Sequence, residues 1–203
     1  QGTIRRGARC STAKAFLRDI GGRPNLHTVI YAQATKVIFN KNKRAIAVEF
    51  DKNKLRHVVY ARKEIILSAG SLNSPQLLML SGVGPRHHLE SLKIPVVHDS
   101  PGVGQNLQDH IGVGGLGFLT DAPVTVVQSR VFVAKSFTQW STLGIGPLTM
   151  LGGLDGLGFI KTKYANKSED FPDVEIHFIP SSPSSDGGET VRKNMGLKEG
   201  LFM

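Results

Sequence analysis

Residues that could carry chemistry occur at a few places in the chain, and most of them lack suitable partners. His87 and His88 are adjacent, so on a helix their side chains diverge by about 100° and suit a shared metal ion poorly. Asp109 and His110 could form an acid–base pair, but adjacent side chains seldom converge, which favours a pair that holds a loop by hydrogen bonds. Cys10 is the only cysteine, which excludes an internal disulfide and a site with several cysteine ligands. We therefore expect no metal site.

A literal G-x-G-x-x-G occurs at residues 112–117. A phosphate-binding loop of this type lies between a strand and a helix, so that backbone N–H groups and the helix N-terminus face the diphosphate. Here the segment 118–123 follows, which the sequence predicts to be extended and then turned. We interpret the motif instead as a glycine-rich strand at which another backbone approaches closely.

The stretch 67–84 is the most informative part of the sequence. Ile65-Ile66-Leu67 is apolar at consecutive positions, which predicts a strand buried on both faces, as in a parallel sheet. Ser74 as N-cap, Pro75 at the first helical position and Gly82 after the last turn predict a helix that is apolar all round and deeply buried. Ala69, Gly70 and Ser71 then lie at a strand end, where ligands bind in open α/β sheets. Small side chains there fit either a cofactor contact or tight packing of helix on strand.

The remaining elements follow from periodicity and turn residues. Residues 34–39, 45–50 and 55–60 predict a three-stranded antiparallel meander, preceded by a short extended run at 26–31. The sequence also predicts helices at 13–20, 85–92 and 131–143, strands at 112–119 and 173–179, and a polar loop at 181–190. Six glycines within 101–117 predict a domain transition near residue 112. The fold class is α/β, with helices and strands mixed.

Charge is distributed unevenly. Of the net +9, residues 1–63 contribute 15 lysines and arginines against 3 acidic residues, whereas residues 64–203 hold 10 against 13. A basic half can bind nucleic acid, another polyanion or a phosphate-bearing cofactor, or can simply form a solvated face. Aromatic residues make up only 7% of the chain and are not interleaved with the basic ones, which disfavours nucleic acid. No apolar run approaches the roughly 20 residues of a membrane span.

The stretch 70–84 resembles the second signature of the glucose–methanol–choline (GMC) oxidoreductases, a family of FAD-dependent enzymes. Every constrained position of that signature is filled: Gly70, Ser71, Ser74, Pro75, Leu77, Leu78, Ser81, Gly82, Val83 and Gly84. Residues 9–17, Asn25-Leu26, the strand at Lys36-Val37, and the run 104–110 also resemble family segments. Residues 146–149 and 158–162 look most like those of the arthropod members often named glucose dehydrogenases.

The resemblance implies an FAD-binding domain with a β-meander over residues 1–111 and the beginning of a substrate domain over residues 112–203. It implies FAD contacts at Val37, through its backbone to the adenine, and at Ala69, Gly70 and Ser71, with further contacts at Asn106, Asp109 and His110. The implied reaction is oxidation of an alcohol or sugar by hydride transfer to the flavin, followed by electron transfer to an acceptor.

The family's own diphosphate-binding loop and its catalytic histidine motif match no position here, so we expect a central fragment of a longer enzyme, with the catalytic residues elsewhere in that enzyme. The fragment's partner is then the remainder of its own chain. Two alternatives stay open: a basic module at residues 1–63 that binds nucleic acid or another polyanion, and a non-catalytic member of the same family.

Overall fold

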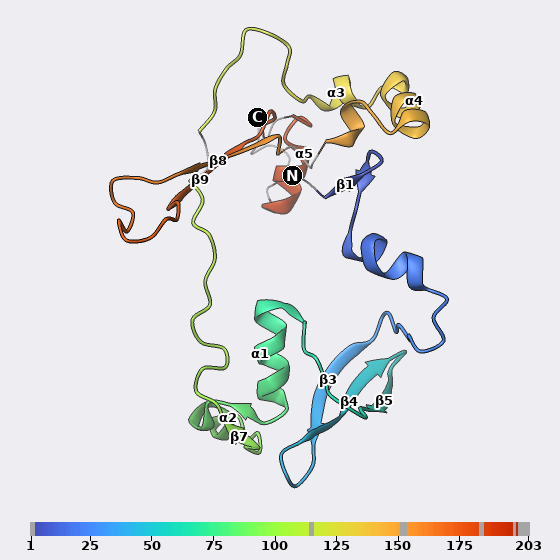
Figure 1. Ribbon diagram of the computed structural model, residues 1–203, viewed down its shortest axis with the longest axis vertical. Coiled ribbons are helices and arrows are strands. Elements are labelled where there is room, and N and C mark those ends of the chain that lie inside the picture. The colour runs from blue at the N-terminus through green and yellow to red at the C-terminus, as the bar shows by residue number, and fades with distance from the viewer. Residues whose placement is uncertain (1–2, 114–115, 151–153, 183–184, 197, 199–203) are drawn as a thin grey trace. The chain divides into compact units, whose positions relative to one another are not determined.

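The computed structural model describes residues 3–113, 116–150, 154–182, 185–196 and 198. The chain divides into two compact units, one formed by residues 25–112 and the other by residues 1–24 together with 113–203. The first unit contains β3 (Gln33–Phe39), β4 (Ala45–Lys52), β5 (Leu55–Tyr60), α1 (Gly70–Leu80), β6 (Val83–Gly84), α2 (Arg86–Ser91) and β7 (His98–Asp99). Helix α1 and the three long strands of this unit are visible in Figure 1.

The predicted meander is confirmed. Strands β3, β4 and β5 form one antiparallel sheet in that order, and Val37, Val48 and Val59 face one another across it. The side chain of Asn40 closes the first turn by accepting hydrogen bonds from the N–H groups of Asn42 and Arg44, at 2.9 and 3.0 Å. The second turn is a two-residue loop in which Asn53 and Lys54 have φ of 52° and 64°, the left-handed geometry that matches the twist of a hairpin.

The extended run expected at 26–31 forms no strand, and neither does the segment at Ile65–Leu67. Ile66 is 77% exposed, so the expectation of a strand buried on both faces is wrong for the described chain. The reason is that consecutive apolar residues indicate burial on two faces but do not supply the neighbouring strands. None of the described strands pairs with this segment.

Helix α1 begins at Gly70, four residues before the predicted start. Gly70 has φ +88°, a turn that glycine adopts without strain. Ser74 still satisfies an N–H group near the helix start, because its Oγ accepts from the Ala69 N–H at 3.0 Å, but it does so from inside the helix. Pro75 therefore lies in the interior and not at the first helical position.

The deep burial expected for this helix is also wrong in the described chain. Leu77 is 7% exposed, whereas Leu72 and Leu80 are 68% and 47% exposed. The helix contacts β3, beside which it lies in Figure 1, and β6. An apolar circumference thus predicts that the helix is packed, but not how many of its faces are covered.

The second unit contains short elements. They are β1 (Ile4–Arg5), β2 (Ala8–Arg9), η1 (Ala13–Leu17), η2 (Arg18–Ile20), α3 (Gln128–Val131), α4 (Ala134–Leu143), η3 (Pro147–Thr149), β8 (Gly156–Ile160), β9 (Val174–Phe178) and α5 (Glu189–Asn194). The helix expected at 13–20 is present as a wide π turn followed by a 3₁₀ turn. The helix expected at 131–143 is divided at Phe132 and Val133, where a β-branched residue adopts extended geometry.

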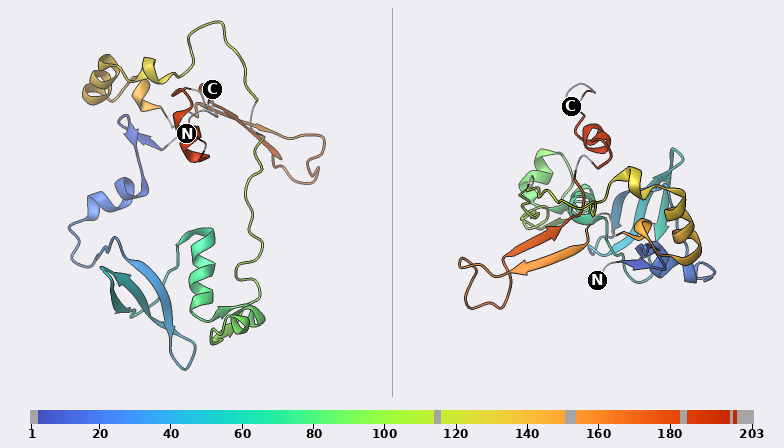
Figure 2. Two further views of the ribbon diagram at one scale, coloured as in Figure 1. Left: turned by 180° about the vertical axis from the view of Figure 1, so that it is seen from behind. Right: turned by 90° about the horizontal axis from the view of Figure 1, so that it is seen from above.

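The strand expected at 173–179 is confirmed as β9, which pairs antiparallel with β8 in the long hairpin seen in Figure 2. The strand expected at 112–119 is wrong in its described part: residues 112–113 and 116–119 form no ladder, and the side chains of Phe118 and Leu119 are exposed. Residues 114 and 115 lie outside the described residues.

The polar loop expected at 181–190 is shorter than predicted, because helix α5 begins at Glu189. Among the described residues, we find no helix that is both long and apolar enough to traverse a bilayer.

Candidate functional site

The centre of the candidate site is a buried hydrogen bond between helix α1 and strand β3. The N–H of Val37 donates to the hydroxyl oxygen of Ser81 at 2.8 Å, and that hydroxyl donates in turn to the carbonyl oxygen of Leu77 at 2.5 Å. Val37 is 3% exposed and Ser81 is 2% exposed. Through these two hydrogen bonds, both the Ser81 hydroxyl and the Val37 N–H have a partner. Buried polar groups need such partners.

The backbone N–H and C=O groups of Val37 lie on the edge of β3 that is next to α1. Strand β3 is at the edge of the sheet, and its Val37 N–H points away from β4. Because the N–H and C=O of a strand residue point to the same edge, the Val37 carbonyl lies on the edge that α1 contacts, where Val37 as a whole is only 3% exposed. In the described chain the Val37 N–H already has a partner and the residue is buried, so the backbone contact implied for Val37 stays a prediction.

Two glycines of the signature have clear structural reasons. Gly82 has φ +89°, and a Cβ there would lie 2.4 Å from the Pro95 carbonyl oxygen. A Cβ at Gly84 would lie 2.8 Å from the Cγ of Met79. Between them, Val83 begins the short strand β6, which pairs in parallel with β7. The Ser-Gly-Val-Gly run therefore forms a tight turn after α1, and strand β6 at the end of this turn contacts the helix.

The turn formed by Ala69, Gly70 and Ser71 lies at the other end of α1, about 16 Å from Ser81 by the rise of an 11-residue helix. All three residues are exposed. A Cβ added at Gly70 would meet nothing within 4 Å, so the positive φ, not crowding by the described chain, calls for glycine. The backbone here is exposed in the described chain, which leaves room for a cofactor or for a neighbouring segment.

Asn106, Asp109 and His110 lie in an exposed segment without regular structure. Asn106 has φ +56°, and its Oδ1 accepts from Gln108 Nε2 at 2.9 Å. The Asp109 carboxylate accepts from the N–H of His110 at 2.8 Å and not from its ring. This agrees with a polar pair that holds a loop, and the hydrogen bonds of these residues do not link them to α1 or β3.

The literal G-x-G-x-x-G at 112–117 is not followed by a helix: α3 begins only at Gln128. At Gly112 and Gly117 an added Cβ would meet nothing within 4 Å, so the close backbone approach expected there is also absent at these two described glycines. His87 and His88 are both exposed on α2. Within the described ranges, no three His, Cys, Asp or Glu side chains gather in a way that could hold a metal ion.

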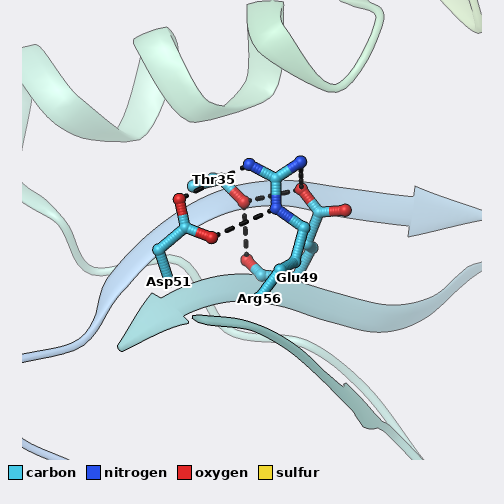
Figure 3. A network of polar contacts seen from close by, with 4 residues as sticks. All are labelled: Thr35, Glu49, Asp51 and Arg56. Carbon is cyan, nitrogen blue, oxygen red and sulfur yellow. Dashed lines mark hydrogen bonds and ion pairs between the residues drawn. The ribbon is translucent and has the colours of Figure 1, made fainter. Parts of the chain in front are cut away.

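A polar network on the meander was missed by the sequence reasoning. Figure 3 shows Arg56 of β5 bound to Asp51 through Nε at 3.1 Å and through a terminal nitrogen at 3.4 Å, with Glu49 at 3.5 Å. Thr35 donates to the Glu49 carboxylate at 2.7 Å. The hydrogen bond to Asp51, then the charges of Asp51 and Glu49, raise the pKa of Arg56 above its ordinary value. The alternation of Glu49 and Asp51 on one strand face, opposite Arg56, was the available signal.

Comparison with known proteins adds an independent line of evidence. Residues 2–112 match the family model described as GMC oxidoreductase. Over 183 residues the chain is 40% identical to the mitochondrial choline dehydrogenase of Mus musculus, a match that covers 88% of this chain and 29% of the mouse protein. Over 198 residues it is 39% identical to the oxygen-dependent choline dehydrogenase of Pseudomonas putida, covering 93% and 33%. The chain thus spans about a third of the length of these relatives.

Solved structures agree. An FAD-dependent oxidoreductase from Chaetomium thermophilum superposes with a TM-score of 0.66 at 30% identity, covering 77% of this chain and 28% of that one. A formate oxidase superposes with a TM-score of 0.68 at 26% identity, covering 90% and 35%. The mixed α/β fold expected from the sequence is therefore confirmed.

Proposed function

The chain belongs to the GMC oxidoreductase family, and we propose that it is part of an FAD-dependent enzyme that oxidises an alcohol. The observation that carries the proposal is the signature at 70–84, in which Gly70, Ser81, Gly82 and Gly84 each have a structural role in this chain. When bound, the flavin accepts the hydride of the alcohol carbon and passes the two electrons to an acceptor.

We propose that this chain's contribution is to bind and orient FAD. The open turn at Ala69, Gly70 and Ser71 leaves room beside the backbone, and the family resemblance also implies a backbone contact at Val37. Asn106, Asp109 and His110 are the second group of proposed contacts. We assign the general base that takes the hydroxyl proton to the remainder of the enzyme.

We propose that residues 1–111 belong to the FAD-binding domain and residues 112–203 to the substrate domain. A change in glycine content near residue 112 supports this division. The electron acceptor and the alcohol are the enzyme's small-molecule partners in this proposal, and nucleic acid is not among them.

For the alcohol, we propose choline or a related small alcohol as the first candidate, because the mouse and Pseudomonas relatives are choline dehydrogenases at 40% and 39% identity. A sugar such as glucose is the second candidate, supported by the likeness of residues 146–149 and 158–162 to arthropod glucose dehydrogenases. Identity over most of the chain supports the first candidate more than two short segments support the second.

The test is a substrate panel with the full-length enzyme. Choline, glucose, an aryl alcohol and a simple aliphatic alcohol are each supplied with a reducible dye, after the released cofactor has been identified by mass. FAD together with turnover of choline supports the first candidate, and turnover of glucose alone supports the second. A protein that carries FAD but oxidises none of them would be the non-catalytic family member.

A basic module remains the alternative from another class. Arg5, Arg6, Lys14 and Arg18 line one depression of about 200 Å³ together with Asp19. Binding of DNA or heparin with a steep salt dependence, by a protein that purifies without flavin, would favour this alternative over an oxidoreductase.

A further inference from the structure

We propose that Asn166, in the loop that joins β8 to β9, is a site of N-linked glycosylation. Asn166-Lys167-Ser168 is the only triplet of the chain in which asparagine is followed by a residue other than proline and then by serine or threonine. Such a triplet is the acceptor for an N-linked glycan. The inference is independent of the function proposed above, because attachment of a glycan requires neither a flavin nor an alcohol.

The triplet lies in a loop that is long for a hairpin. Strand β8 ends at Ile160 and β9 begins at Val174, so the loop comprises residues 161–173, whereas most hairpin loops have about 2–5 residues. Figure 2 shows this loop at the tip of the hairpin. Every residue of the loop is exposed or half-buried, and all three residues of the triplet are exposed. A bulky glycan attached there requires no buried side chain to move.

The side chains of the triplet are arranged around the Asn166 amide. Its Oδ1 accepts hydrogen bonds from the Ser168 N–H at 3.1 Å and from the Ser168 hydroxyl at 2.8 Å. The first bond closes an Asx turn, and the second holds beside the amide the hydroxyl that the acceptor triplet requires. Both bonds use the amide oxygen, so neither involves the nitrogen, which is the atom that receives the sugar.

The Asn166 nitrogen can also meet the chemistry of the transfer. Nδ2 carries two hydrogens, and the bond to the Glu169 carboxylate at 2.9 Å uses one of them. In the transfer, a bond forms between Nδ2 and the anomeric carbon of a lipid-linked oligosaccharide, while the bond from that carbon to the lipid pyrophosphate breaks. The amide nitrogen gives up one proton, and the lipid pyrophosphate is the leaving group.

Asn40 provides an internal comparison. It is exposed, and its Oδ1 also accepts two backbone hydrogen bonds in a turn, from the N–H groups of Asn42 and Arg44. The residue two positions after Asn40 is Asn42, which has no hydroxyl. Exposure and a turn closed by the side chain are thus common to both asparagines, and the hydroxyl beside the amide distinguishes Asn166.

The experiment uses the full-length protein, produced with its own N-terminus in cultured eukaryotic cells. Peptide mass mapping before and after a glycosidase that releases N-linked glycans identifies the modified residue, because release converts that asparagine to aspartate. We expect a glycan on Asn166 and none on Asn40. An unmodified Asn166 in the wild-type protein overturns the proposal, and this measurement does not depend on the folding of any variant.

Two substitutions at one position test the role of the hydroxyl. Ser168→Ala removes the group that bonds to the Asn166 amide and should abolish the glycan. Ser168→Thr retains a hydroxyl and should keep the glycan. A glycan that persists in the alanine variant, or that is lost from both variants, overturns the assignment of this triplet as the acceptor.

Discussion

The indole Nε1 of Trp140 donates a hydrogen bond of 2.8 Å to the carbonyl oxygen of Gly7, and so joins the β1–β2 hairpin to helix α4 across 133 residues. The backbones also touch, since a Cβ added at Gly7 would lie 2.4 Å from the carbonyl oxygen of Gly144. Trp140 is the only tryptophan of the chain, so its fluorescence reports on this contact without interference.

Gly7→Ala should therefore detach the hairpin from α4. Gly7 has φ +67°, and the new methyl group would overlap a backbone oxygen that cannot move aside easily. We expect a loss of about 1–3 kcal/mol from the left-handed backbone alone, and a red shift of the tryptophan emission. Gly22→Ala is the control, because a Cβ there meets nothing within 4 Å. Unchanged emission and stability in the Gly7 variant would contradict this packing.

Gly82→Ala should disrupt the corner after α1. Its φ is +89°, and the added Cβ would approach the Pro95 carbonyl oxygen to 2.4 Å and Val97 Cγ2 to 2.9 Å. The hydrogen bond from the Val97 N–H to the Gly82 carbonyl, at 2.8 Å, should open with it. Amide exchange at Val97 measures this directly, and we expect faster exchange in the variant. Gly102→Ala has no neighbour within 4 Å and should leave the exchange rate as it is.

The different burial of two leucines in α1 predicts that their replacement by alanine lowers the stability of the fold unequally. Leu77→Ala should cost about 2–5 kcal/mol of unfolding free energy, because the residue is only 7% exposed. Leu80→Ala, at 47% exposure, should cost much less. Urea denaturation of the two variants of residues 1–203 provides the comparison. Equal losses would show that both faces of the helix are covered.

Asp173 gives the β8–β9 hairpin a pH dependence. Hydrogen bonds from the Thr162 hydroxyl, at 2.6 Å, and from its N–H, at 2.8 Å, lower the pKa of the Asp173 carboxyl below its ordinary value. A lowered folded pKa means that the stabilisation is present above the ordinary pKa, about 3.9, and is lost as pH falls through the folded pKa. Thr162→Val should shift the titration of Asp173 back toward its ordinary value, as read from its side-chain NMR resonance. An identical titration in the variant would contradict the role of Thr162.

Local chemistry in the sequence predicted the meander and the hairpin strand at Val174–Phe178 well. Alternating apolar residues and polar turns such as Asn40–Lys43 specify an antiparallel sheet over short distances. The same reasoning failed at Ile65–Leu67 and in the described part of 112–119, because strand pairing there depends on neighbouring strands that the local pattern does not identify.

The site was predicted as a set of positions but not as a set of contacts. The small residues at 69–71 and the serine and glycines at 81–84 were visible in the sequence, yet nothing local reveals that Ser81 bonds to Val37, 44 residues earlier. The start of α1 was misplaced for a related reason. A serine before a proline is the common start of a helix, but here Gly70 turns the chain first and Ser74, inside the helix, accepts a hydrogen bond from the Ala69 N–H.

The most direct test of the central claim is the reduction of the full-length protein by an alcohol in the absence of oxygen. We predict that the purified protein shows the visible absorbance of oxidised FAD and that this absorbance bleaches on adding choline, with one alcohol oxidised for each flavin reduced. Admission of a suitable electron acceptor should restore the oxidised spectrum. A full-length protein that contains no flavin, and takes up none when FAD is supplied, would contradict the account.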